Sequence, residues 1–343
     1  MSNNQETQII PATMRALELG SYEQEDDSLR LVQRKVPRPG KGEVLVRIAA
    51  APVNPSDLVF LRGLYGQKKK LPVVPGFEGS GVVVAAGRGL LGRYLLGKRV
   101  ACAAPFDGDG TWAEYMSTQA GHCIPLLKQT DTEAAASLII NPFTAWALLE
   151  GARRTGARAV AQSAAASALG RMLIKLAARR NLPVVNIVRR AEQVELLRSE
   201  GAQHVLDSSA PDFDERLCSL CDELGATVAF DPVAGEMTGR LLRAVGKGGR
   251  VVVFGALSFE GCLIDPRSLM EGKTAEGFWL SEWMRSQNIL NIILTARKVQ
   301  KLLGDELKTE VRARLPLEKA VEGLRQYEKE MTGGKILFVP GLR

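Results

Sequence analysis

The chain has 343 residues, of which 45% are hydrophobic and 24% charged, an ordinary composition for a globular protein of about two domains. No apolar run reaches the roughly 18 residues that a membrane helix needs, and the first six residues have neither the basic nor the apolar region of a secretory signal. The net charge of +7 is compatible with anionic ligands, but it is spread along the chain without an aromatic-interleaved patch, which argues against nucleic-acid binding.

The stretch from about residue 12 to 140 contains short strand patterns broken by glycine and proline. The strands are predicted at 44–48, 79–84 and 99–101. Such spacing is typical of a small, irregular β-domain.

From about residue 143 to 280, strand and helix patterns alternate, which predicts an α/β fold with a parallel sheet. Residues 157–207 form one βαβαβ pattern, with its first strand at 158–162. The turn after that strand, 163–170, is made of small residues that allow a backbone to approach a pyrophosphate, and the next helix offers its N-terminal N–H groups. Because only Gly170 remains of the usual glycines, an alanine-rich turn without a cofactor stays open as an alternative.

The second strand of this unit, 183–188, ends about twenty residues after the turn. A fingerprint for NAD places Asp or Glu there, on the ribose 2′-hydroxyl. This chain has Arg189 and Arg190 instead. Guanidinium groups bind a 2′-phosphate that a carboxylate would repel, so the pattern favours NADPH over NADH.

Further strands are predicted at 203–206, 226–230 and 250–254. Cys218 and Cys221 form a CxxC on a predicted helix without a second pair, which favours packing over metal binding. The five cysteines of the chain are scattered, as expected for a reducing, cytoplasmic protein. Two helices near 289–303 and 317–330 and a strand at 335–339 complete the chain.

The order of these pieces resembles the medium-chain dehydrogenase/reductase superfamily over essentially the whole chain. The supporting stretches are 51–57 (APVNPSD), 74–81 (VPGFEGSG) and 141–146 (NPFTAW). The resemblance implies a GroES-like irregular β-barrel catalytic domain at 1–142, a doubly wound Rossmann domain at 143–284, and a C-terminal segment at 285–343 that returns to the catalytic domain.

In the zinc-dependent branch of that superfamily, ligands stand near the positions of Asn54 and Phe77, and neither residue can replace them. The chain has only two histidines, His122 and His204, and lacks the four-cysteine structural lobe. We therefore expect no metal. The zinc-free 2-enoyl thioester reductases carry a tyrosine in Gly-x-Tyr-Gly after Asn-Pro-Ser-Asp, and Tyr65 matches it. By that resemblance Tyr65 is the proton donor, and its phenol keeps its proton at neutral pH.

The run 277–283 (GFWLSEW) is also similar to these reductases, where it borders the nicotinamide pocket. The alternative is an aromatic plug of the core. The resemblance implies that the cofactor, NADPH, contacts a set of residues that lies mostly in the Rossmann domain: Asn141, Ala166, Ser167, Ala168, Leu169, Gly170, Arg189, Arg190, Phe254, Gly255, Ala256, Leu257, Phe278, Trp279, Leu280 and Lys335. Ala166 and Ala168 replace an Asn and a Gly that the family commonly has.

The implied reaction is hydride transfer from NADPH to the β-carbon of an α,β-unsaturated thioester, with protonation of the α-carbon by Tyr65. Quinone reductases share Gly-Leu-Tyr, so a quinone or another enone stays open as the substrate, and a non-catalytic binding role is a third class. The run Lys68-Lys69-Lys70 is either a solvated loop or a docking site for coenzyme A or an acyl carrier protein. The family commonly forms homodimers through the edge of the nucleotide-binding sheet, and 257–264 is expected to supply that edge.

Overall fold

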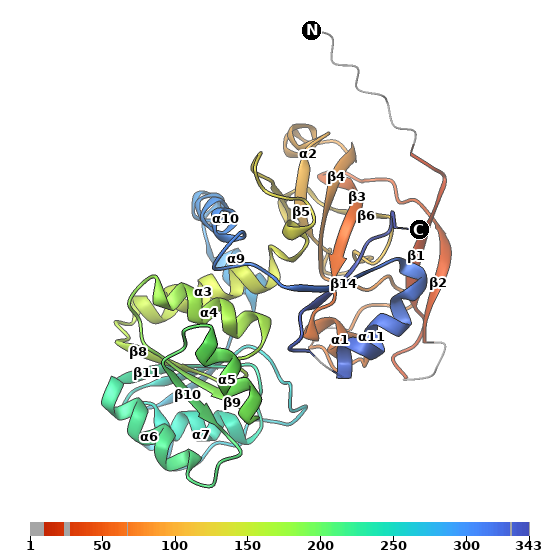
Figure 1. Ribbon diagram of the computed structural model, residues 1–343. Coiled ribbons are helices and arrows are strands. Elements are labelled where there is room, and N and C mark those ends of the chain that lie inside the picture. The colour runs from red at the N-terminus through yellow and green to blue at the C-terminus, as the bar shows by residue number, and fades with distance from the viewer. Residues whose placement is uncertain (1–9, 24–27, 67, 330, 343) are drawn as a thin grey trace. The chain divides into compact units, whose positions relative to one another are not determined.

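The computed structural model describes residues 10–23, 28–66, 68–329 and 331–342, so the expectation about a secretory signal at residues 1–6 lies outside the described residues. The chain forms two compact units (Figure 1). Unit 1 comprises Met1–Ile139 and Thr309–Arg343, and unit 2 comprises Ile140–Lys308. Within the described ranges, no helix is long and apolar enough to cross a membrane.

Unit 1 is built on a two-stranded sheet and a seven-stranded sheet. The small sheet pairs β1 (Thr13–Leu19) with β2 (Leu29–Lys35). The larger sheet has the order β14-β15-β3-β4-β5-β7, and β6 pairs with β3. Its strands are β3 (Glu43–Pro52), β4 (Glu78–Ala86), β5 (Arg99–Ala103), β6 (Tyr115–Gln119), β7 (Cys123–Pro125), β14 (Val311–Leu315) and β15 (Lys335–Phe338). The helices of unit 1 are α1 (Pro55–Leu61), α2 (Leu90–Leu95) and α11 (Ala320–Lys329), with 3₁₀ turns at Ala120–His122, Ala134–Ser137 and Leu317–Lys319.

The last strand of the chain completes the core of unit 1. β15 pairs antiparallel with β3, so that Leu337 lies opposite Pro52 and Phe338 opposite Ala51. The Phe338 ring meets the buried Trp112 ring edge to face at 5.0 Å. Because both rings are fully buried, this contact joins the C-terminal segment to the N-terminal β-domain through apolar packing.

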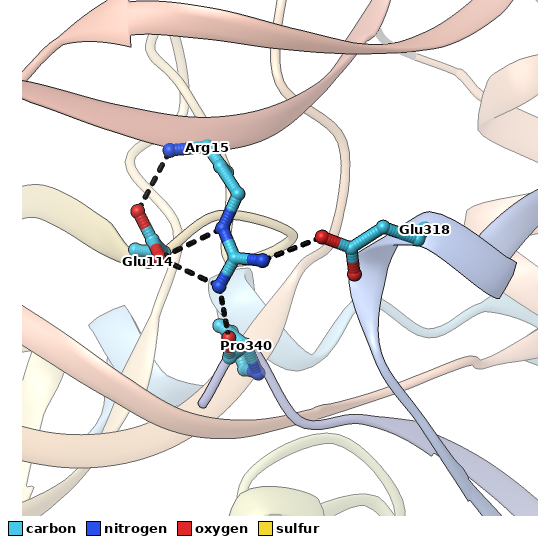
Figure 2. Close-up of polar contacts among 4 residues, drawn as sticks. All are labelled: Arg15, Glu114, Glu318 and Pro340. Atoms are coloured by element: carbon cyan, nitrogen blue, oxygen red, sulfur yellow. Dashed lines mark hydrogen bonds and ion pairs between the residues drawn. The ribbon is translucent and has the colours of Figure 1, made fainter. Parts of the chain in front are cut away.

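One arginine adds polar contacts to the same junction (Figure 2). The Arg15 guanidinium, on β1, donates from two of its nitrogens to Glu114 Oε1 at 2.9 and 3.0 Å. It also donates to the Pro340 carbonyl at 2.8 Å and to Glu318 Oε1 at 2.5 Å. The planar fork of arginine suits several acceptors at once, so one side chain connects residues that are up to 325 positions apart.

Unit 2 contains a six-stranded parallel sheet with the order β10-β9-β8-β11-β12-β13. This is the 3-2-1-4-5-6 order of a doubly wound sheet, and it confirms that prediction. The strands are β8 (Ala159–Gln162), β9 (Val184–Val188), β10 (His204–Asp207), β11 (Ala226–Asp231), β12 (Arg250–Val253) and β13 (Thr274–Gly277). The helices are α3 (Ile140–Arg154), α4 (Ala168–Ala178), α5 (Ala191–Ser199), α6 (Phe213–Leu224), α7 (Glu236–Ala244), α8 (Pro266–Met270), α9 (Leu280–Ser286) and α10 (Ile289–Leu302).

Helices cover both faces of this sheet. One apolar cluster contains α6 and α7 side chains, such as Phe213 and Leu241, packed on the strands. Another contains Ile174 of α4 and Leu197 of α5. Figure 1 shows α6 and α7 on one side of the sheet and α4 on the other. Every residue of β8 and β9 is buried as a result, which explains why both strands are apolar apart from Gln162 and Asn186.

The structure corrects the expectation that residues 257–264 form an edge of this sheet. Residues 257–264 form loop and turn, and the two edge strands are β10 and, after this segment, β13 at Thr274–Gly277. In the 257–264 segment Phe259 has a φ of +59°, which no strand residue adopts. The segment instead forms backbone bonds with the loop after β11, for example Leu263 N–H to the Gly235 carbonyl at 3.0 Å.

Candidate active site

Gly170 allows the first turn of the βαβ unit to pack closely. A Cβ at Gly170 would lie 2.4 Å from the Ala165 carbonyl oxygen, so only glycine fits there. Ser167 caps α4 by accepting the Gly170 N–H at 3.1 Å. The turn Ala166–Gly170 therefore stands at the N-terminus of α4, at the carboxyl end of β8, where a doubly wound sheet binds nucleotides.

A carboxylate on the neighbouring strand fixes this end of the sheet. Asp231, at the end of β11, accepts the Ser163 hydroxyl at 2.6 Å and the Thr238 hydroxyl at 2.7 Å. It also accepts the Val233 N–H at 2.9 Å. β8 and β11 are the strands between which the strand order reverses. Asp231 thus connects the end of β11 to the turn after β8. A doubly wound sheet has its ligand-binding crevice between the strands where the order reverses.

A pair of buried amides lies below the turn. Gln162 Nε2 donates to Asn186 Oδ1 at 2.8 Å and to the Gly170 carbonyl at 3.0 Å. Asn186 in turn donates to the Val184 and His204 carbonyls at 2.9 and 3.1 Å. These bonds connect β8, β9, β10 and the first turn of α4 through side chains that are hidden from water.

The two arginines of the cofactor prediction follow β9 directly, and both are exposed. Arg190 begins α5 as its N-cap residue and forms an exposed ion pair with Glu192 at 3.2 Å. The Arg189 N–H donates to Gln193 Oε1 at 3.3 Å. This bond holds the backbone that presents the two guanidinium groups.

The other predicted cofactor contacts of unit 2 follow the next strands. Phe254 N–H donates to the Asp231 carbonyl at 3.0 Å, and Leu257 N–H donates to the Pro232 carbonyl at 3.0 Å. Phe278 follows β13, with its N–H on the Val253 carbonyl at 2.8 Å. Trp279, the N-cap residue of α9, is 44% exposed. The structure thus brings the residues of 166–170, 189–190, 254–257 and 278–280 to the carboxyl ends of four strands, whereas Asn141 is buried in the first turn of α3.

In unit 1, Tyr65 lies in the loop after α1, against an aromatic stack. Its ring is 4.8 Å from the Phe77 ring, with a tilt of 35°. Phe77 meets Phe60 edge to face at 5.5 Å, and Phe60 meets Tyr22 at 5.8 Å. Burial, and then the negative charge of Asp57, raise the pKa of Tyr65 to about 12. The phenol therefore keeps its proton throughout the neutral range.

Four buried polar residues adjoin this stack through the bond from the Phe77 N–H to Asp57: Asn54, Asp57, Glu78 and Lys335. The Lys335 ammonium, 1% exposed, donates to Asn54 Oδ1, and Asn54 Nδ2 donates to Glu78 Oε1 at 3.1 Å. Burial lowers the pKa of Lys335 against the opposite effect of Glu78 and Asp57. Burial raises the pKa of Asp57 to about 7 against the effect of the Asn54 N–H bond. We call these four residues the buried ionic cluster.

Lysines 68–70, which the sequence presents as one run, have different environments. Lys69 Nζ donates to the Gly108 carbonyl at 2.7 Å and the Pro105 carbonyl at 3.0 Å, and lies about 6 Å from the Phe60 and Phe77 rings. Burial lowers its pKa to about 8. Lys68 and Lys70 are exposed. Within residues 68–70, a docking partner can therefore reach Lys68 and Lys70 more readily than Lys69.

Comparisons with known families and proteins agree with this architecture. Residues 40–128 match the alcohol dehydrogenase GroES-like domain, and residues 168–295 match the zinc-binding dehydrogenase family. Bovine mitochondrial enoyl-[acyl-carrier-protein] reductase is 30% identical over 284 residues, which cover 81% of this chain and 75% of the relative. The chain belongs to the medium-chain dehydrogenase/reductase superfamily. It is an oxidoreductase.

Two solved structures extend the comparison. A putative NADPH:quinone reductase from Mesorhizobium loti is 33% identical to this oxidoreductase, with a TM-score of 0.89 over 97% of this chain and 100% of that one. A mycobacterial protein solved in complex with NADPH is 26% identical, with a TM-score of 0.79 over 95% of this chain and 100% of that one. The similarity spans both units, which confirms the predicted pairing of a GroES-like domain with a Rossmann domain.

Zinc does not fit the residues that stand where the resemblance places the ligands of the zinc-dependent branch. The Asn54 amide is bonded on both sides, to Lys335 and Glu78, and the Phe77 ring offers no donor atom. The buried ammonium of Lys335 also supplies positive charge beside the two carboxylates. Among the described residues, no group of three or more His, Cys, Asp or Glu side chains is arranged to hold a metal ion.

Several residues of these sites have little or no signal in the sequence. Asp57 and Glu78 stand inside the quoted stretches 51–57 and 74–81, but nothing in those stretches indicates that both are buried and lie near Lys335. Asp231 had a local signal, an acid that ends a strand and precedes Pro232. Gln162 and Asn186 had a weaker one, since each is a polar residue in an apolar strand.

Proposed function

We propose that this oxidoreductase is an NADPH-dependent reductase of activated C=C bonds, and that its substrate is a 2-enoyl thioester. The observation that carries the proposal is Tyr65, a protonated phenol stacked on Phe77 in the GroES-like unit. A reductase of an enoyl thioester needs a proton donor for the α-carbon, and a positioned phenol can serve as a general acid.

For NADPH, the residues at the carboxyl edge of the unit 2 sheet supply matching chemistry. The N-terminus of α4 and the small turn 166–170 suit the pyrophosphate, and Arg189 and Arg190 suit the 2′-phosphate. Residues 254–257, Phe278 to Leu280 and Asn141 complete the proposed site. When bound, NADPH supplies the hydride. Because the Lys335 ammonium is already bonded to Asn54, the cofactor proposal depends on the other residues.

The chain's own residues then have separate tasks. The aromatic stack of Phe60, Phe77 and Tyr22 keeps water from one side of the Tyr65 ring. The Tyr65 hydroxyl holds the proton that the α-carbon receives, and solvent later returns a proton to the phenolate. A thiol or imidazole is not required for this step.

A quinone is the second candidate substrate. It is favoured by the Mesorhizobium loti structure, described as a putative NADPH:quinone reductase, which is 33% identical over nearly the whole chain. The enoyl thioester is preferred because the run 277–283 is similar to that of the 2-enoyl thioester reductases, and because the bovine enoyl-[acyl-carrier-protein] reductase is 30% identical to this chain.

The test follows NADPH oxidation with a trans-2-enoyl-CoA and with a small quinone. Tyr65→Phe should lower kcat for the enoyl-CoA by about 10²- to 10⁴-fold, the usual contribution of a general acid. The exposed Tyr94 offers a matched control, and Tyr94→Phe should leave both rates unchanged. Undiminished enoyl reduction by Tyr65→Phe refutes the proton donor, and turnover of the quinone alone favours the second candidate.

We further propose that Lys68 and Lys70 help to dock the anionic carrier of the substrate, coenzyme A or an acyl carrier protein. If they do, the KM for a carrier-linked substrate rises with salt, because screening weakens exposed charge pairs. The double variant Lys68→Ala/Lys70→Ala should abolish that salt dependence. A KM that is independent of salt in the unmodified enzyme removes the docking role.

A homodimer and a cytoplasmic location complete the proposal. β13, one of the two edge strands of this sheet, is mostly exposed, and an edge strand can pair with a second copy. Sedimentation velocity should give a dimer, and Glu276→Pro should weaken it, whereas a monomer at every concentration refutes it. The cysteines are all free, as in a reducing compartment.

A further inference from the structure

The carboxylate of Asp57 connects the two backbone segments that meet at Tyr65. Asp57 Oδ2 accepts the Asn54 N–H at 2.7 Å, which fixes the start of α1, the helix that leads into the Tyr65 loop. Asp57 Oδ1 accepts the Phe77 N–H at 3.1 Å, which fixes the residue whose ring lies against Tyr65. One buried side chain therefore determines the position of the loop and of the ring beneath it.

Both bonds need acceptor oxygens, because both partners are backbone N–H groups. An asparagine at this position has one acceptor oxygen and one donor nitrogen, so one of the two N–H groups would lose its partner in a buried place. The Phe77 and Asn54 segments cannot both keep their present positions in that case. A shift of the Phe77 ring changes where the Tyr65 hydroxyl lies.

We propose that Asp57 is a positioning residue for Tyr65, acting through the Phe77 backbone. The inference depends on the proposed role of Tyr65 as proton donor. Asp57 does not touch the substrate. Its task is to hold the phenol at the place where the α-carbon receives its proton, and a small displacement of a positioned acid lowers the rate of the chemical step.

The groups around Asp57 are consistent with a positioning role. The charges that act on it are those of Lys335 and Glu78, and its own charge acts on Tyr65, Lys69 and Tyr327. Tyr327, on α11, is a second buried tyrosine, and the charge of Asp57 helps to raise its pKa. Tyr327 has no proposed part in the reaction. It therefore provides a comparison for the experiment.

The experiment is a double-mutant cycle on enoyl-CoA reduction. Asp57→Asn should lower kcat by about 10- to 100-fold with little change in KM, since the interaction lost is one made in the transition state. In a Tyr65→Phe background the same substitution should have almost no effect, because the group that it positions is gone. In a Tyr327→Phe background, Asp57→Asn should lower kcat as much as it does in the unmodified enzyme.

A solvent isotope effect separates positioning from general damage. Asp57→Asn should enlarge the effect of D₂O on kcat, because transfer of the proton becomes slower than the other steps. Asp131→Asn is the matched control, since Asp131 also accepts a backbone N–H, from Ala134 at 2.8 Å, but at an exposed turn. That variant should keep the kcat and the isotope effect of the unmodified enzyme.

If Asp57→Asn does not fold, Asp57→Glu replaces it in the cycle, because it keeps both acceptor oxygens but moves them by one methylene away from the Asn54 and Phe77 N–H groups. An equal loss of kcat with and without Tyr65, or an unchanged isotope effect, overturns the positioning role. A Tyr65→Phe variant with full enoyl reduction instead refutes the proposed proton donor, so the two failures are distinguishable.

Discussion

The two candidate sites of this oxidoreductase are assembled in different ways. In unit 2, the proposed cofactor residues other than Asn141 follow the ends of parallel strands, each within a few residues of its strand. In unit 1, the buried ionic cluster unites residues 54, 57 and 78 with Lys335, whose ammonium reaches Asn54 across 281 positions of sequence. The first site depends on backbone geometry and exposed charge, and the second on burial and long-range pairing. Substitutions of the exposed charges in the first site should therefore change mainly cofactor binding, and substitutions in the second site should change mainly stability.

The largest effect on stability is expected from Lys335→Met. The change leaves Asp57 and Glu78 buried without their cation, so the free energy of unfolding should fall by about 3–5 kcal/mol. Urea denaturation measures it. Lys273→Met is the control: its Nζ is bonded to the Arg243 carbonyl, but its carboxylate partner Glu271 is exposed. Equal losses in the two variants would contradict the special role of the cluster.

A smaller effect, on NADPH binding and not on stability, is expected from replacing Arg189 and Arg190. Arg189→Ala/Arg190→Ala should raise KM for NADPH by about 10- to 100-fold, the value of one or two charge-assisted hydrogen bonds, with little effect on KM for NADH. Stability should hardly change, because both side chains are exposed. Arg198→Ala, on the exposed surface of α5, serves as the control. Equal effects on the two cofactors would refute the NADPH assignment.

Gly170→Ala tests whether backbone packing alone maintains the cofactor edge. The added Cβ would lie 2.4 Å from the Ala165 carbonyl oxygen, so about 1–3 kcal/mol of stability should be lost through overpacking. NADPH binding, measured by calorimetry, should weaken as well. Gly151→Ala in α3 has open space around its Cβ and should be neutral or slightly stabilising. A stable Gly170→Ala enzyme with normal NADPH affinity would show that the turn tolerates a different packing.

The smallest effect is expected from Arg15→Met, which breaks the polar junction in Figure 2. Because Arg15, Glu114 and Glu318 are all partly exposed, we expect a loss of about 1–2 kcal/mol in thermal or urea unfolding. Arg285→Met, which removes an exposed helical pair with Glu282, should cost about 0.5 kcal/mol or less. A loss as large as that of Lys335→Met would mean that partly exposed charges stabilise unit 1 as strongly as buried ones.

Much of the architecture follows from local sequence. The alternation of strands and helices from 143 to 280 predicts a parallel sheet, and the small residues of 163–170 predict a turn that a pyrophosphate can approach. Arg189 and Arg190 stand at the end of β9, where the spacing places the residues that meet the ribose. Strand periodicity and turn chemistry act over a few residues, so the sequence contains this information directly.

The tertiary structure alone decided the rest. It placed β13, and not residues 257–264, at the edge of the sheet, and it separated Lys69 from its exposed neighbours. It also buried Asp57, Glu78 and Lys335 together. The sequence by itself determined the superfamily, the Rossmann unit and the candidate tyrosine. The ionic cluster could not be read from it, because the pairing of residues so far apart depends on how β15 docks on β3, and that depends on the packing of the whole core of unit 1.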